Sequence, residues 1–157
     1  MSKIHRVRTL HVSFESAAKV LHTRPRSVLV GPERNPSLGT DLLGLRVEHD
    51  VELTMGSFEA VDDPVRAGTV RFRIEASQHP ELFPVLDADL ELTPTAEGVE
   101  VALEGTYRVP GGLFGTLADR GGMHRVADQS IDRFFDGLTG RLRSEAASID
   151  AMTGVPV

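Results

Sequence analysis

The chain of 157 residues is long enough to bury a hydrophobic core and short enough to form one domain. Its 17 basic and 23 acidic residues give a net charge of −6, which argues against a nucleic-acid-binding surface or an anionic membrane, because phosphates attract basic patches. The absence of cysteine excludes disulfides, thiolate metal sites and cysteine nucleophiles, and it fits the reducing cytoplasm in which we expect the protein to work.

The N-terminal residues carry charges but lack the apolar run that a signal peptide contains. No segment of the chain approaches the roughly 18 consecutive apolar residues that a membrane-spanning helix needs. We therefore expect no membrane insertion.

Residues 4–12 alternate in a way that predicts a strand, but the pattern does not define its buried face. Leu10 and Val12 would lie on one side, and Arg6 and Arg8 would share that side if the strand were regular. Either a bulge or a short strand would separate the two kinds of side chain, and the sequence does not choose between them.

Residues 13–22 predict a short helix, with Ser13 as its N-cap and Pro25 shortly after its end. Residues 23–45 are rich in Gly, Pro and Asn, which predicts a loop with short extended pieces. A loop of this length is either a lid over a site or a plain surface excursion.

Four later segments alternate apolar and polar residues, and they span residues 46–58, 69–77, 85–93 and 99–109. A period of two predicts one buried and one solvent-exposed face, as in an antiparallel sheet. The apolar faces carry, in order, Val47, His49, Val51, Leu53 and Met55; Val70, Phe72, Ile74 and Ala76; Leu86, Ala88, Leu90 and Leu92; and Val99, Val101, Leu103, Gly105, Tyr107 and Val109. Gly105 either admits a helix or a ligand, or marks a bulge.

The strand pattern ends at Pro110, and residues 121–143 then repeat at helical spacing. Gly137 and Gly140 each cost about 1 kcal/mol of helix propensity, and we expect them to allow close approach to a curved sheet. Charged residues enter the stripe beyond Leu138, so we expect the last turns to extend past the sheet, followed by a flexible tail at 151–157. The stripe contains Met123, Ala127, Ser130, Ile131, Phe134, Leu138 and Leu142.

A sheet with one apolar face needs a cover, and one helix with one apolar stripe supplies it. A single helix does not fill the concave face of a wide, twisted sheet, so the remaining space is either filled by large side chains or left as a cavity. The chain has no Trp, one Tyr and seven Phe. Large side chains are therefore few, which favours a cavity.

The order of these elements resembles the helix-grip fold of the START-like (SRPBCC) superfamily, which includes polyketide cyclases and lipid carriers. The segments LFPVLDADLELTP (82–94), LEGTYRVPGGLFGTLADR (103–120) and HRVADQSIDRFFDGL (124–138) are similar to an actinobacterial branch of that superfamily. The resemblance implies an α+β fold in which a curved antiparallel sheet wraps around one long C-terminal helix, with residues 1–150 as a single START-like domain. The Trp-containing segment that follows the first helix in cyclase-like members is replaced here by HTRPRSVLVGPERNP.

Two inward-facing polar residues are the candidates for chemistry in such an interior. His49 lies between Val47 and Val51 on the apolar face, and it is either a pocket histidine or a core histidine that bonds the backbone. Tyr107, the single tyrosine, would either orient a ligand or anchor the hinge that follows it. We predict a ligand-binding set of His49, Met55, Phe72, Ile74, Tyr107, Met123, Ala127 and Ile131.

We predict no metal site and no cofactor. The six histidines show none of the close spacings that metal ligands use. Asp128, Asp132 and Asp136 stand four residues apart on the helix, where they could hold a cation, but we interpret them as a solvated face with Arg125 and Arg133 beside it.

Three functions fit this pattern. The first is binding of a small hydrophobic or aromatic molecule in a cavity between the sheet and the C-terminal helix, as a carrier or sensor. The second is a polyketide cyclase- or dehydratase-like enzyme in which His49 or Tyr107 acts as general acid or base. The third is a protein with a filled core that works through partners. The sequence assigns no catalytic residue, ligand identity or oligomeric state.

Overall fold

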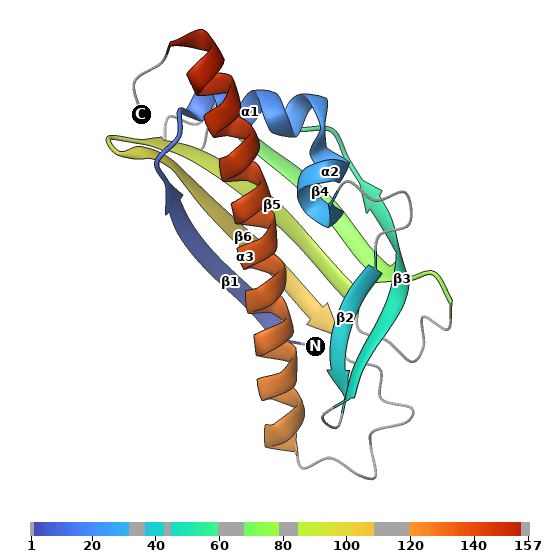
Figure 1. Ribbon diagram of the computed structural model, residues 1–157. Coiled ribbons are helices and arrows are strands. Elements are labelled where there is room, and N and C mark those ends of the chain that lie inside the picture. The colour runs from blue at the N-terminus through green and yellow to red at the C-terminus, as the bar shows by residue number, and fades with distance from the viewer. Residues whose placement is uncertain are drawn as a thin grey trace.

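The fold is that of a computed structural model, which describes residues 2–31, 37–42, 45–59, 68–78, 85–108 and 120–154 (Figure 1). Within these ranges, the side chains of Ser2 and of residues 37–50 and 120–127 are left undescribed. The predictions for residues 109–119, among them the hinge that begins at Pro110, concern residues outside the described ranges.

One antiparallel sheet of six strands forms the body of the described structure, in the order β1-β6-β5-β4-β3-β2. Three helices accompany it, and Figure 1 shows the long α3 crossing one face of the curved sheet, with α1 and α2 at one end of that face. This is the predicted α+β helix-grip arrangement. The elements are β1 (Ser2–Leu10), α1 (Phe14–Thr23), α2 (Pro25–Val30), β2 (Ser37–Leu42), β3 (Leu45–Met55), β4 (Gly68–Ala76), β5 (Val85–Thr95), β6 (Gly98–Arg108) and α3 (Arg120–Thr153).

The core lies between the sheet and the helices, where the predicted alternation places it. Along β4, β5 and β6, alternate side chains are buried while their neighbours are partly exposed. From the helix side, Ile131, Phe134, Leu138 and Leu142 are buried against them, as the predicted stripe requires. Burying apolar area on both surfaces is the main force that holds α3 to the sheet.

Strand β1 is regular, so neither the bulge nor the short strand is needed. Its nine residues pair one for one with β6, from Ser2 opposite Tyr107 to Leu10 opposite Val99. Ile4 and Leu10 are buried on the inner face, and the arginines between them point toward α3. Acidic residues on that helix neutralise them, as described below.

The prediction that residues 23–45 form a loop with short extended pieces is wrong in one place, where a helix forms, and a short strand agrees with it. Helix α2 occupies residues 25–30, with Pro25 in its first turn, where a missing N–H costs no hydrogen bond. Strand β2 occupies residues 37–42 and pairs with β3, from Ser37 opposite Asp50 to Leu42 opposite Leu45. Six residues of α2 are too few to show a helical period in the sequence.

The last turns of α3, beyond Leu138, pack on α1 and α2. Arg141 donates from Nε to the Val28 carbonyl oxygen at 2.8 Å and from Nη2 to the Leu29 carbonyl oxygen at 3.1 Å, which satisfies the end of α2. Glu145 accepts a hydrogen bond of 3.1 Å from Ser27 Oγ. The charged residues in the stripe are therefore contacts between helices.

Asp150 joins the end of α3 to the start of α1. Ser13 is the N-cap of α1, as predicted, and its Oγ accepts from the Ser16 N–H. The Asp150 carboxylate accepts three further bonds, from Ser13 N–H at 2.9 Å and from the Ser13 and Ser16 hydroxyls at 2.6 Å each. Asp150 is 0% exposed. Two distant segments thus share one buried polar network.

Candidate functional site

The candidate site is the part of the inner face farthest from α1. There, two rows of residues run across the strands beneath α3. One row joins Leu53, Ile74, Leu86 and Tyr107 from β3 to β6, and the next joins Met55, Phe72, Ala88 and Gly105. The described side chains of both rows are buried or partly buried. Residues in such a row lie side by side, so they form one continuous surface.

Helix α3 covers this surface with apolar side chains. Ile131 and Phe134 are both buried, and the Phe134 ring lies 6.1 Å from the Phe72 ring between centroids, with a tilt of 39°. That separation is within the range in which aromatic rings attract each other. Met55 and Phe58 pack at the β3 side of the same core while remaining partly exposed.

Five of the eight predicted ligand-binding residues therefore share one described surface: Met55, Phe72, Ile74, Tyr107 and Ile131. The backbone of His49 belongs to β3 and pairs with Leu38, and Met123 and Ala127 belong to α3. The side chains of these three lie outside the described residues. The two rows and their cover are completed by three further residues: Leu53, Leu86 and Phe134. The strand alternation and the helical stripe in the sequence would have identified them as well.

Tyr107 is the polar group of this surface. It is 7% exposed, and no hydrogen bond to its hydroxyl is found among the described residues. Burial raises the pKa of the phenol well above its ordinary value, because the charged form would lose its hydration. Tyr107 therefore stays protonated at any physiological pH and offers a hydrogen-bond donor.

The close approach of β5 explains why residue 105 is a glycine. A Cβ at this position would collide with the backbone oxygen of Asp87 and with Ala88. The pairing of β5 with β6 is regular here, so no bulge is present. With Ala88 opposite it, Gly105 leaves the β5 and β6 end of the second row without any long side chain.

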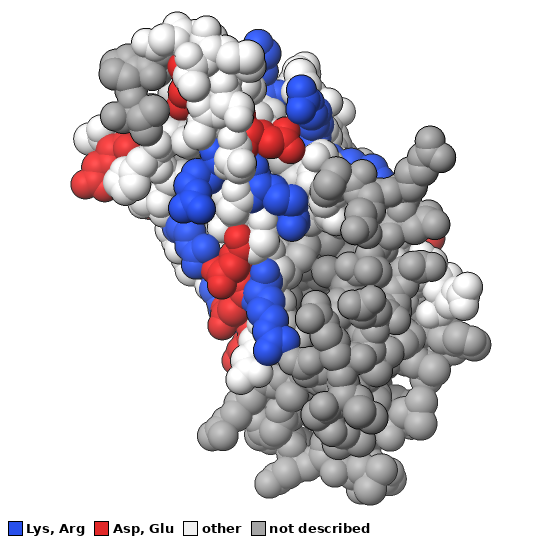
Figure 2. Space-filling view, in the orientation of Figure 1, with Lys and Arg blue, Asp and Glu red and all other residues white. Residues whose placement is uncertain are grey.

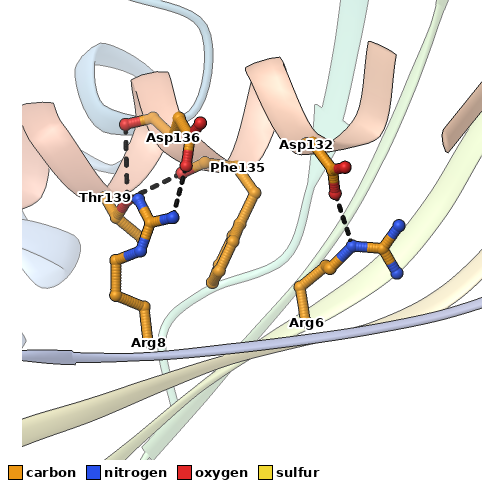
Figure 3. Close-up of polar contacts among 6 residues, drawn as sticks. All are labelled: Arg6, Arg8, Asp132, Phe135, Asp136 and Thr139. Atoms are coloured by element: carbon orange, nitrogen blue, oxygen red, sulfur yellow. Dashed lines mark hydrogen bonds and ion pairs between the residues drawn. The ribbon is translucent and has the colours of Figure 1, made fainter. Parts of the chain in front are cut away.

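One long side of α3 is joined to β1 by ion pairs (Figure 3). Arg6 donates from Nε to Asp132 Oδ1 at 2.6 Å and lies 3.6 Å from Asp128 Oδ1. Arg8 pairs with Asp136, donates to Thr139 Oγ1 at 3.1 Å, and lies 5.6 Å from the centre of the Phe135 ring. Figure 2 shows basic and acidic side chains gathered along the exposed side of α3.

The aspartate row is a solvated face, as predicted, since each carboxylate remains more than half exposed, and it also pairs with the arginines of β1. The sequence shows the arginines and the aspartates, but it does not show that they lie close together, because β1 and α3 are about 125 residues apart in the chain.

Two findings concern the described residues as a whole. No group of three His, Asp or Glu side chains among them is arranged to hold a metal ion. None of the helices in the described ranges combines the length and the apolar character needed to cross a membrane.

Comparison with known proteins supports the fold. No protein-family model and no curated protein matches the chain. Among solved structures, it is similar to TTHA0849 from Thermus thermophilus, with a TM-score of 0.58, 14% identity and coverage of 94% of this chain and 99% of that one. It is similar to the di-domain ARO/CYC StfQ from the steffimycin biosynthetic pathway, with a TM-score of 0.56, 15% identity and coverage of 95% of this chain and 52% of that one.

Ara h 8.0201 is a third similar structure, with a TM-score of 0.51, 14% identity and coverage of 91% of this chain and 98% of that one. These likenesses support the helix-grip fold. Membership of the START-like superfamily and of its actinobacterial branch stays a prediction.

Proposed function

We propose that the protein binds a small aromatic or otherwise hydrophobic molecule between α3 and the inner face of the sheet, as a carrier or sensor. The observation that carries this proposal is the Tyr107 hydroxyl, which is buried on an apolar surface without a described partner. A buried donor without an acceptor costs about 1–3 kcal/mol. A ligand oxygen would remove that cost, so the ligand we propose is apolar with one hydrogen-bond acceptor, such as a ketone.

The shape of the surface supports the same proposal. On β4, the large side chains of Phe72 and Ile74 form a wall. On the neighbouring strands β5 and β6, Ala88 has a short side chain and Gly105 has none. A shallow floor beside one aromatic and one aliphatic side chain suits a flat ring. The folds of StfQ, which takes part in steffimycin biosynthesis, and of Ara h 8.0201 are compatible with this use and do not specify it.

The test uses prodan, a fluorescent naphthyl ketone whose emission depends on hydrogen bonding to its carbonyl. We expect prodan to bind, and Tyr107→Phe to weaken it about three- to ten-fold, the equivalent of one neutral hydrogen bond. The emission should shift to the blue in the variant. Thr106→Val is the matched control, since it removes a hydroxyl from the neighbouring residue on the outer face.

Two competing ligands separate the loss of the hydrogen bond from the Tyr107 hydroxyl from the loss of side-chain volume. Acetylnaphthalene should lose affinity in Tyr107→Phe, whereas isopropenylnaphthalene, which has the same shape without the oxygen, should not. Equal effects on both competitors would refute the role of the hydroxyl. Absence of any saturable binding would refute the cavity and favour a filled core.

A cyclase-like enzyme is the alternative, and the described residues restrict how it could work. General acid–base catalysis needs a pKa near the working pH, and burial moves the pKa of Tyr107 in the wrong direction. Catalysis would then depend on His49. Loss of turnover of a linear polyketide analogue in His49→Ala, with prodan binding retained, would establish the enzyme, whereas unchanged turnover would exclude His49.

A further inference from the structure

The inner face of the sheet is least covered along residues 51–58, which we call the β3 margin. The apolar side chains that line this face on β4, β5 and β6 are at most 7% exposed. At the margin, Leu53, Met55 and Phe58 pack against the core but remain partly exposed. Within the described residues, the pairing of β3 with β2 ends at Asp50, so no described strand lies on the other side of the margin. The inner surface therefore reaches solvent there.

The opposite edge of the sheet, at β1, is bridged to α3. Arg6 pairs with Asp132, and Arg8 pairs with Asp136 and donates a hydrogen bond to Thr139. These side chains span the space between β1 and the helix, as Figure 3 shows. An apolar molecule that approached along this edge would have to break the bridges, whereas at the β3 margin it meets apolar side chains.

The chain contains one extra residue just after β3. In the last regular pair, Met55 lies opposite Phe72. The next bridge joins Glu59 to Thr69, and these two residues exchange N–H···O bonds of 2.8 and 2.9 Å. Three residues on one side thus stand against two of β4, which is a β-bulge. Bulges redirect side chains and are frequent next to active sites.

The bulge moves Phe58 from one face of the sheet to the other. In a regular strand, Phe58 would share the outer face with Glu52 and Thr54, which are exposed. Its ring instead lies where a side chain of Gly68 would be, and Gly68 is buried on the inner face of β4. Phe58 is therefore an inward-pointing aromatic side chain at the β3 margin, and the glycine leaves room for its ring.

We infer that a ligand enters and leaves the inner surface across the β3 margin, and that the Phe58 ring is a gate that turns away from Gly68 to let the ligand pass. This rotation moves a side chain only, so the hydrogen bonds between β3 and β4 stay intact. The inference rests on the proposed function, since it needs a ligand beneath α3. A gate changes the rates of binding and release together, because the equilibrium depends only on the free and bound states.

Stopped-flow fluorescence with prodan tests the gate. Phe58→Ala should raise the rates of association and dissociation about three- to ten-fold each and change the Kd less than about two-fold. If the alanine variant does not fold, Phe58→Leu should show the same pattern. A higher dissociation rate alone, with a proportionally weaker Kd, would show that Phe58 is only a ligand contact and would overturn the gate.

Arg6→Gln is the control for the route, because it removes the bridges from Arg6 to α3 at the opposite edge. It should leave both rates with prodan unchanged. An acceleration as large as that of Phe58→Ala would place the route at β1 and refute entry across the β3 margin.

Gly68→Ala tests the ring without deleting it. The new Cβ would collide with the Phe58 ring and displace it, so both rates should rise about two- to five-fold. In the Phe58→Ala background, Gly68→Ala should have no further effect on either rate. Unchanged rates in the single variant, or an equal effect in both backgrounds, would refute the role of the ring.

A measurement without ligand separates this inference from the proposed function, and it uses the absence of native cysteine. Val70 and Leu103 are both 0% exposed and belong to one row across the sheet, with Val70 nearer the β3 margin and Leu103 next to β1. Iodoacetamide should modify Val70→Cys at least about five-fold faster than Leu103→Cys. Adding Phe58→Ala should accelerate only the reaction at position 70.

The outcomes of this measurement are distinct. Equal rates at the two positions would mean that only global unfolding exposes them, which would overturn the opening at β3. Absence of prodan binding together with the faster reaction at position 70 would refute the proposed function and support the opening.

Discussion

Replacing Asp150 by alanine should be among the most destabilising single changes in the described structure. The substitution leaves three donors without their acceptor: the Ser13 N–H, the Ser13 hydroxyl and the Ser16 hydroxyl. Ser16 is buried, so water replaces these bonds poorly. At about 1–1.5 kcal/mol for each donor, the free energy of unfolding should fall by about 3–5 kcal/mol.

Asp150→Asn is the matched variant, because it keeps the shape and one acceptor oxygen while its amide group faces the Ser13 N–H with a second donor. We expect a loss of about 1–3 kcal/mol. Urea unfolding followed by far-UV circular dichroism measures both variants in a chain that has no tryptophan. A loss below about 0.5 kcal/mol in Asp150→Ala would refute the argument that this network joins α3 to α1.

The same carboxylate should make stability depend on pH. Desolvation acts to raise the pKa of Asp150, but the hydrogen bonds from Ser13 and Ser16 outweigh it and hold the pKa below its ordinary value. The stabilisation is therefore complete above the unfolded-state pKa of about 3.9 and is lost as pH falls through the lower folded-state pKa. Asp150→Asn should lose this part of the acid dependence; an identical pH profile in both proteins would contradict the assignment.

Three further changes test the packing around the candidate site and the helices. Gly105→Ala should destabilise the protein by about 1–3 kcal/mol in urea unfolding, because its Cβ collides with the β5 backbone; a neutral effect would refute the close approach. Phe134→Ala should cost about 3–5 kcal/mol through loss of the contact with Phe72, against less than about 1 kcal/mol for Tyr107→Phe. Arg141→Met should lower the thermal midpoint by leaving the end of α2 without donors, and an unchanged midpoint would show that water replaces them.

Local patterns in the sequence were enough to predict the central strands and the helix that covers them. The alternation in β4, β5 and β6 assigned the buried side chains correctly, because a strand places successive residues on opposite faces whatever its neighbours are. The helical stripe in α3 identified Ile131, Phe134, Leu138 and Leu142 for the same local reason. Five of the predicted ligand-binding residues follow from these periods and are found on one surface.

The roles of the charged residues became visible only in the three-dimensional structure. Arg6 and Arg8 conflicted with a regular strand until α3 supplied Asp128, Asp132 and Asp136 from the other end of the chain. Periodicity gives the face on which a residue lies, and it contains no information on which distant residue meets that face. Gly105 and Gly140 show the same limit, since both are small residues in regular elements, yet β5 crowds one of them and open space surrounds the other.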